Sequence, residues 1–191
     1  MTDEGIVVLG IPIPSSSPLF LTIVAVHVAA GVICTVAGIV AMLAPKRSGR
    51  HPSVGTGYYW SLVVVFLTMA ALSILRWPAN THLFILGVLS FGAGVVGRMV
   101  QRRRSLGRLR AHVAGMGLSY ILLLTAFYVD NGPHLPLWRS LPPLAHWLLP
   151  SIGGLPILIW AITRHPLIRW LHSQGATWQP HADARKSSAS R

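Results

Sequence analysis

Histidines are the side chains of this sequence that could do chemistry. The chain contains nine histidines but only four Asp and Glu residues. Paired histidines hold the iron of b-type haem between two imidazoles, whereas acid–base catalysis and proton-coupled transport usually need carboxylates as well. Haem ligation is therefore the chemistry that this composition favours. The candidate ligands of haem or another tetrapyrrole are His27, His51, His82, His112 and His146.

Five apolar stretches provide the elements that would position these histidines. They cover residues 18–44, 58–75, 82–101, 111–129 and 144–163. Each is close to the length of about 20 residues with which an α-helix crosses about 30 Å of hydrocarbon. The chain is 52% hydrophobic and only 10% charged, whereas soluble domains have about 25% charged residues. The sequence thus predicts an all-α fold, an integral membrane helical bundle of five transmembrane helices.

The basic residues predict how this bundle is oriented in the membrane. If the N-terminus lies outside, every Lys and Arg except Arg76 and Arg139 falls on the inner side. Because cytoplasmic loops are enriched in these residues, we expect the N-terminus outside and the C-terminus in the cytoplasm, in a multi-pass protein of the bacterial inner (cytoplasmic) membrane. This bias, with anionic membrane lipids as partners, explains the net charge of +12 without nucleic acid.

Two short segments flank the bundle. Residues 1–17 are expected to form an outer N-terminal segment, residues 18–163 the transmembrane domain, and residues 164–191 a cytoplasmic segment. Apolar and basic residues mix within 166–172, which predicts a short amphipathic helix on the membrane surface. The polar tail 181–191 is expected to be disordered.

Small residues at helical spacing predict close contacts between helices. They form single faces in the first, third and fourth stretches: Ala30, Cys34 and Gly38; Gly87, Ser90, Gly94 and Gly97; and Ala111, Gly115 and Ser119. Helix backbones approach closely in lipid where bulky side chains are missing. On this interpretation Cys34 is a packing residue, and as the single cysteine it can form no intramolecular disulfide.

The predicted topology also gives each histidine a depth in the membrane. His27 lies roughly 13 Å inside the outer end of the first helix, at about 1.5 Å per residue. A second haem ligand at this depth would stand near Leu67, Ser90, Ile121 or Gly153, and none of these is a histidine. Because an ionisable group this deep is costly, His27 is a functional candidate. It either hydrogen-bonds to a neighbouring helix as neutral imidazole or ligates a tetrapyrrole, for example the magnesium of a chlorophyll-type pigment.

The other four candidate histidines lie near the ends of helices. His82 and His146 stand at the outer ends of their helices, where they are candidate partners of His27 or residues that cap and anchor the helices. On the inner side, His51 lies in the first basic loop, as a ligand or as a solvated residue that faces lipid headgroups. His112 lies at the start of the fourth helix, as a ligand or a cap. These two would share a depth if the loop folds back over the bundle.

Several segments carry a resemblance to a known family. They are Ala111–Ile121 (AHVAGMGLSYI), Thr125–Gly132 (TAFYVDNG), Leu141–Pro156 (LPPLAHWLLPSIGGLP), and His27, His51 and Gly57 in the first half. Over residues 20–163 the chain resembles the bacterial membrane-protein family catalogued as domain of unknown function 2306. The resemblance implies a small polytopic helical membrane protein and no established activity. Its motif positions here are His27, His51, His112, Ser119 and Tyr120, and Pro52 stands where the family has arginine after the histidine.

Two functions are compatible with these features. The first is a non-enzymatic accessory or scaffold subunit, which packs against other integral membrane subunits in a larger energy-converting complex, respiratory or photosynthetic. The second is a b-type haem protein that transfers electrons across the membrane, with His51 paired to His112 and His27 paired to His82 or His146. The mismatched depth of His27 favours the first. No set of residues typical of a catalytic or metal site is found, and the cofactor left open is haem b or a chlorophyll-type pigment.

Overall fold

Five long helices make up most of this protein, whose structure is a computed structural model that describes residues 6–8, 11–13, 17–45, 49–100 and 106–164. The helices are α1 (Pro18–Leu43), α2 (Arg50–Leu75), α3 (Thr81–Met99), α4 (Leu106–Asn131) and α5 (Pro143–Arg164). All five are long and apolar enough to cross a membrane. The predicted all-α membrane bundle is therefore confirmed.

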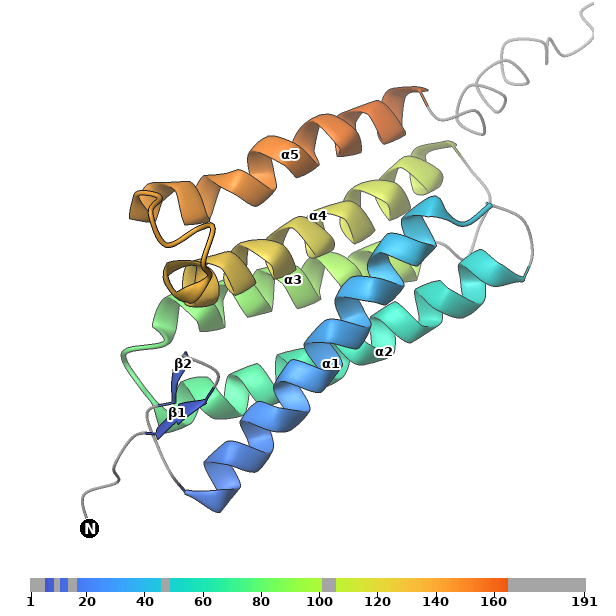
Figure 1. Cartoon of the computed structure of the whole chain (residues 1–191). Coiled ribbons are helices and arrows are strands. Elements are labelled where there is room, and N and C mark those ends of the chain that lie inside the picture. Colours follow the sequence, from blue (N-terminus) through green and yellow to red (C-terminus); the bar gives the residue numbers. More distant parts are fainter. Residues whose placement is uncertain (1–5, 9–10, 14–16, 46–48, 101–105, 165–191) are drawn as a thin grey trace, which may run out of the picture.

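Each helix packs mainly against its neighbours in sequence (Figure 1). Helices α1 and α2 form one antiparallel hairpin, and α3 and α4 form a second, which contacts the first through α2 and α3. Helix α5 follows the short 3-10 helix η2 (Gly132–His134) and returns along α4. Among the described residues, the extensive contacts of α5 are with α4 alone, so its opposite side is left without protein.

A small antiparallel hairpin precedes the bundle. Its strands are β1 (Ile6–Val8) and β2 (Ile11–Ile13), paired so that Val7 lies opposite Pro12. Five of the six strand residues are β-branched, a residue type enriched in strands. The all-α prediction did not include this hairpin. The predicted amphipathic segment 166–172 and the tail 181–191 lie outside the described residues.

Two helices begin earlier than the apolar pattern predicted. Helix α2 starts at Arg50 instead of residue 58, so the prediction that His51 lies in a loop was wrong: it lies in the first turn of α2. Helix α4 starts at Leu106 instead of residue 111, which places His112 in its second turn. Hydropathy marks only the part of a helix that crosses hydrocarbon, and polar turns can continue beyond it. Pro52 is tolerated because the first turn of a helix has no intrahelical partner for its N–H groups.

The predicted close contact between small residues is found between α3 and α4. A Cβ atom added to Gly115 would lie 2.7 Å from the Gly97 Cα and 2.8 Å from the Ala93 carbonyl oxygen. The Ser90 hydroxyl donates a hydrogen bond of 2.8 Å to the Ser119 carbonyl. At Gly97 and Gly115, backbone therefore meets backbone across this seam.

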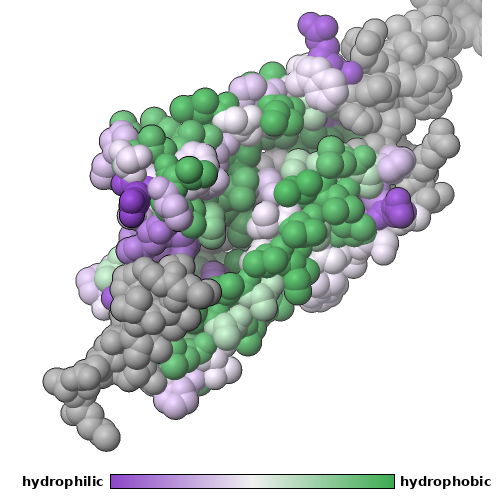
Figure 2. All heavy atoms as spheres, viewed as in Figure 1, coloured by the Kyte–Doolittle hydropathy of each residue, from purple (hydrophilic) through white to green (hydrophobic). Residues whose placement is uncertain are grey.

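A second buried cluster joins α1 to α2. Cys34 is fully buried there, against Tyr58, Leu62 and Val65 of α2. Its role as a packing residue is thus confirmed, and it is a free thiol. Outside these clusters, apolar side chains cover the faces of α1 and α5 that point away from the protein, as Figure 2 shows. Such surfaces are expected where lipid is the solvent.

The α3–α4 seam predicts that replacing one helical glycine by alanine destabilises the protein, whereas the same replacement at another helical glycine does not. The Gly115→Ala substitution should destabilise the protein by about 1–3 kcal/mol, because the added methyl group meets backbone atoms that cannot move aside. The matched control is Gly92→Ala on α3, where a Cβ would meet nothing within 4 Å. Thermal unfolding in mild detergent measures both variants, and equal melting temperatures would contradict the described seam.

Candidate functional site

His51 and His112 lie next to each other at one end of the bundle, which we call the histidine end. His51 comes from the first turn of α2 and His112 from the second turn of α4. Their ring centroids are 6.4 Å apart, and the ring planes are nearly perpendicular, at 86°. Two residues that are far apart in sequence thus meet at one level of the bundle, and His51 reaches this level from the first turn of α2 instead of from a folded-back loop.

Each of these imidazoles is held by a backbone carbonyl group. The Nδ1 of His51 donates to the Ala41 carbonyl at 2.9 Å, and the Nδ1 of His112 donates to the Gly97 carbonyl at 2.8 Å. Both carbonyls lie in the last turn of a helix, where intrahelical N–H partners run out. For Ala41 the reason is visible in the sequence, since the residue four positions later is Pro45, which has no N–H.

These hydrogen bonds determine the tautomer of both rings. A carbonyl oxygen only accepts, so Nδ1 must carry the proton in His51 and in His112. In a neutral imidazole the lone pair is then on Nε2, on the opposite side of the ring. Histidines that ligate metals are commonly oriented in this way, with Nδ1–H on a backbone carbonyl and Nε2 directed to the metal.

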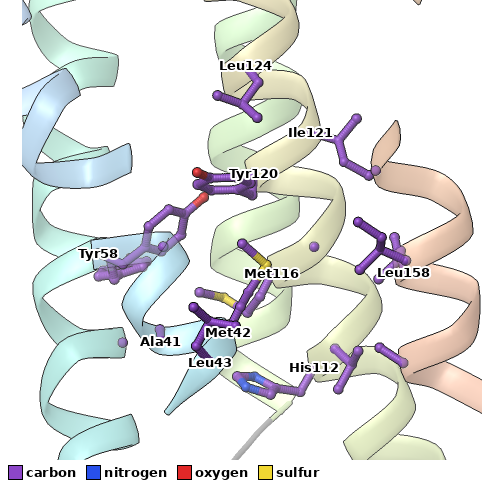
Figure 3. A pocket seen from close by; sticks show the side chains of 18 of the residues that line it. Ala41, Met42, Leu43, Tyr58, His112, Met116, Tyr120, Ile121, Leu124 and Leu158 are labelled. Atoms are coloured by element: carbon purple, nitrogen blue, oxygen red, sulfur yellow. The ribbon is translucent and has the colours of Figure 1, made fainter. Parts of the chain in front are cut away.

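A large cavity begins at the two histidines and continues along α4. Its volume is about 1620 Å³, and its lining extends from Leu109 to Tyr128 of α4, roughly 28 Å at about 1.5 Å per residue. Figure 3 shows Met42 and Met116 projecting between His112 and the ring of Tyr58. Most of the lining is apolar, and the hollow between α1 and α5 is visible in Figure 2.

Two glycines leave part of this cavity open. Gly55 lies one helical turn after His51, on the same face of α2. Gly153 lies on α5, on the other side of the cavity. A Cβ atom added at either position would meet nothing within 4 Å. Unlike Gly97 and Gly115, these glycines bring no backbones together, and any larger side chain would occupy cavity space.

Two tyrosines form a hydrogen-bonded wall beside the cavity. The hydroxyl of Tyr58 is 2.9 Å from that of Ser119, and the hydroxyl of Tyr120 donates to the Thr35 carbonyl at 3.2 Å. Four helices are linked here, since Ser90 of α3 also donates to the Ser119 backbone. Within the described residues no buried side-chain nitrogen or oxygen lacks a partner. Ser119 and Tyr120, two positions of the family resemblance, thus connect helices at mid-depth.

His27 is hydrogen-bonded to a neighbouring helix, one of its two predicted environments. Its Nδ1 lies 2.9 Å from the Thr68 hydroxyl oxygen of α2. Because that hydroxyl donates its single proton to the Val64 carbonyl at 2.8 Å, it accepts from His27. Thr68 follows Leu67, which the predicted topology placed level with His27, and the hydrogen bond shows that His27 and Thr68 lie at one level of the bundle.

His82 and His146 have other partners at the opposite end of the bundle. The His82 ring lies 6.2 Å from that of Trp147. His146 is buried, and its Nε2 donates to the Trp138 carbonyl at 3.2 Å, which anchors α5 to the preceding loop. In the part of the chain that the structure describes, no ring contact joins His27 to either of them. The structure thus brings together only one of the predicted histidine pairs, His51 with His112.

Several residues of the site were missed in the sequence. Tyr58 and Gly55 follow His51 at helical spacing, and Met116 and Tyr120 follow His112 in the same way. This periodicity is a usable signal, but hydropathy places His51 before the start of the apolar helix, so it does not connect the histidine to the helical face. Among the described residues, no group of three His, Cys, Asp or Glu side chains could hold a metal ion. A site built on two histidines is therefore the arrangement to consider.

No protein-family model matches this chain, and it has no match among curated proteins or solved structures. The resemblance to the domain of unknown function 2306 stays a prediction. Functional inference consequently depends on the site itself.

The hydrogen bond between Tyr58 and Ser119 can be tested by a double-mutant cycle. Tyr58→Phe and Ser119→Ala should each destabilise the protein by about 1 kcal/mol, and the double variant should lose less than the sum, because both remove one interaction. Thermal unfolding in detergent gives the coupling energy. Strict additivity would show that the two hydroxyls do not interact.

Proposed function

We propose that this chain binds a b-type haem at the histidine end, with His51 and His112 as its two axial ligands, and functions in electron transfer in the membrane. The observation that carries the proposal is the separation of 6.4 Å between the two ring centroids. A metal–imidazole bond is about 2 Å long. If both imidazoles held one iron between them, with each ring centre slightly beyond its nitrogen, their centroids would be about 6 Å apart.

The anchoring of both rings supports the same proposal. With Nδ1 bound to Ala41 or Gly97, each imidazole has its proton and its orientation determined before any ligand arrives. Such support of a ligating histidine raises its basicity and keeps the ring in place. The two rings also belong to different helical hairpins, so a group held between them would connect the halves of the bundle.

The cavity supports the proposal through its size and chemistry. Its volume of about 1620 Å³ exceeds the range of roughly 300–1,000 Å³ typical of small-molecule sites. Gly55 leaves open space one turn from His51, where a side chain would obstruct a planar ring system. The apolar lining would exclude water from both faces of the ring. Bound there, haem would supply one-electron chemistry, and the chain would hold, orient and insulate it.

A second candidate function is that of an accessory subunit in a larger energy-converting complex. It is favoured by α5, because only 11% of the apolar segment of this helix is buried inside the protein, the lowest value of the five described helices. A helix with so little protein around it contacts lipid or another integral membrane subunit. The two functions are compatible, because haem-binding subunits also occur within larger complexes. We propose the bacterial inner membrane as the location, with the histidine end on the cytoplasmic side.

The absorbance spectrum of the purified protein tests the haem proposal. The dithionite-reduced protein should show the α-band of six-coordinate b-type haem, and His51→Ala or His112→Ala should abolish it. His27→Ala and His82→Ala are the matched controls and should retain the band, because their rings have other partners. A band that depends on His27 but not on His112, or a wild-type protein that stays colourless when supplied with haem, would refute the proposal.

The open space at Gly55 provides an independent test. Gly55→Leu should lower the affinity for added haem at least tenfold, because its side chain would occupy the cavity, while the melting temperature of the haem-free protein should change little. Gly92→Leu is the control, since Gly92 also has open space but does not line the cavity. Titration with haem, monitored by absorbance, measures both. Equal affinities in the two variants would place the binding site elsewhere.

A further inference from the structure

Arg98 is a half-buried cation at the histidine end. It belongs to the last turn of α3, and its guanidinium carbon lies 4.5 Å from the centre of the Tyr59 ring. Both residues line the cavity that also contains His51 and His112. The guanidinium group thus lies over the face of the aromatic ring in a cation–π contact, which favours this position of the side chain.

No carboxylate among the described residues accompanies this cation. The whole chain has four acidic residues, and Asp130 is the one that the structure describes. Asp130 lies near the last residue of α4, at the opposite end of the bundle. In the described ranges Arg98 thus has an aromatic partner but no ion pair. A half-buried cation beside an apolar cavity is stabilised when an anion binds to it.

Arg98 is also linked to the histidine pair through the backbone. Gly97, the preceding residue of α3, accepts the hydrogen bond from His112. On α2, Tyr59 lies two helical turns beyond His51. The cation and the two imidazoles are thus held by the same helix ends, on the border of one cavity.

We infer that Arg98, positioned by Tyr59, binds the carboxylate edge of the tetrapyrrole and selects a pigment with free carboxylates over an esterified one. This inference rests on the proposed function. Haem b has two free carboxylates on one edge, whereas the long-chain ester of a chlorophyll-type pigment offers no anion at the equivalent position. A guanidinium group binds a carboxylate through two parallel N–H···O hydrogen bonds, which a lysine cannot reproduce. The competing role for Arg98 is contact with lipid headgroups alone, which would give no preference between the two pigments.

The test compares haem with its dimethyl ester, which has the same ring and iron but no carboxylate. Haem-free protein in detergent is titrated with each compound, and affinity and spectrum are recorded. Wild-type protein should bind haem at least tenfold more tightly than the ester, since hydrogen bonds to charged groups contribute about 1.5–3 kcal/mol. Arg98→Leu should remove this preference and retain the six-coordinate spectrum, and Arg98→Lys should restore it only in part.

Arg139→Leu is the matched control, because Arg139 is an exposed arginine that does not line the cavity. It should keep the wild-type preference. Equal affinity of wild-type protein for haem and its ester, with a six-coordinate spectrum in both, would overturn the role of Arg98 and leave the haem proposal standing. If wild-type protein gave a six-coordinate spectrum with neither haem nor its ester, the haem proposal itself would be overturned. The affinities of wild-type protein for haem and its ester can be compared without any variant. The role of Arg98 could therefore be refuted even if Arg98→Leu failed to fold.

Discussion

Hydrocarbon offers no hydrogen-bond partner to a polypeptide, so the polar groups of this chain find their partners within the protein. Backbone groups are paired within five helices. At mid-depth, Ser90, Tyr58 and Ser119 are hydrogen-bonded across helices. At the ends of α1 and α3, where carbonyl groups lose their intrahelical partners, histidine side chains of the following helices donate to them.

The same constraint explains why the proposed ligand role of His51 and His112 does not conflict with their role at the helix ends. A histidine that satisfies a helix-terminal carbonyl with Nδ1 stabilises the turn between two helices. In doing so it leaves Nε2 on the side of the ring away from that carbonyl, and both rings line the cavity. Capping and ligation are alternative interpretations of His112 in the sequence, whereas the proposed function uses the two nitrogens of one ring for both. His146 differs, because it is buried and bound to the Trp138 carbonyl through Nε2 itself.

Glycine has two opposite uses in this bundle. Gly97 and Gly115 allow the backbones of α3 and α4 to touch, so a methyl group has no room there. Gly55 and Gly153 face open space and keep the cavity wide. In a sequence both kinds look alike, since each is a glycine within an apolar helix. Only the position of the neighbouring helix distinguishes a close contact from an open wall.

Sequence alone determined the architecture, because the number of spans, their approximate limits and the depth of His27 follow from hydropathy and helical rise. The depth is accurate enough that Thr68, beside the expected Leu67, is the partner of His27. The candidate site was only half predictable. The apolar pattern marks only the part of a helix that lies in hydrocarbon. It therefore did not predict the first two turns of α2, which are more polar and contain His51 and Gly55. Tertiary structure decided that His51 lies beside His112 and that His27 is bonded to Thr68 instead of a second histidine. Such contacts depend on how the two helical hairpins pack. The spacing of residues along one helix does not reveal which other helix will pack against that face.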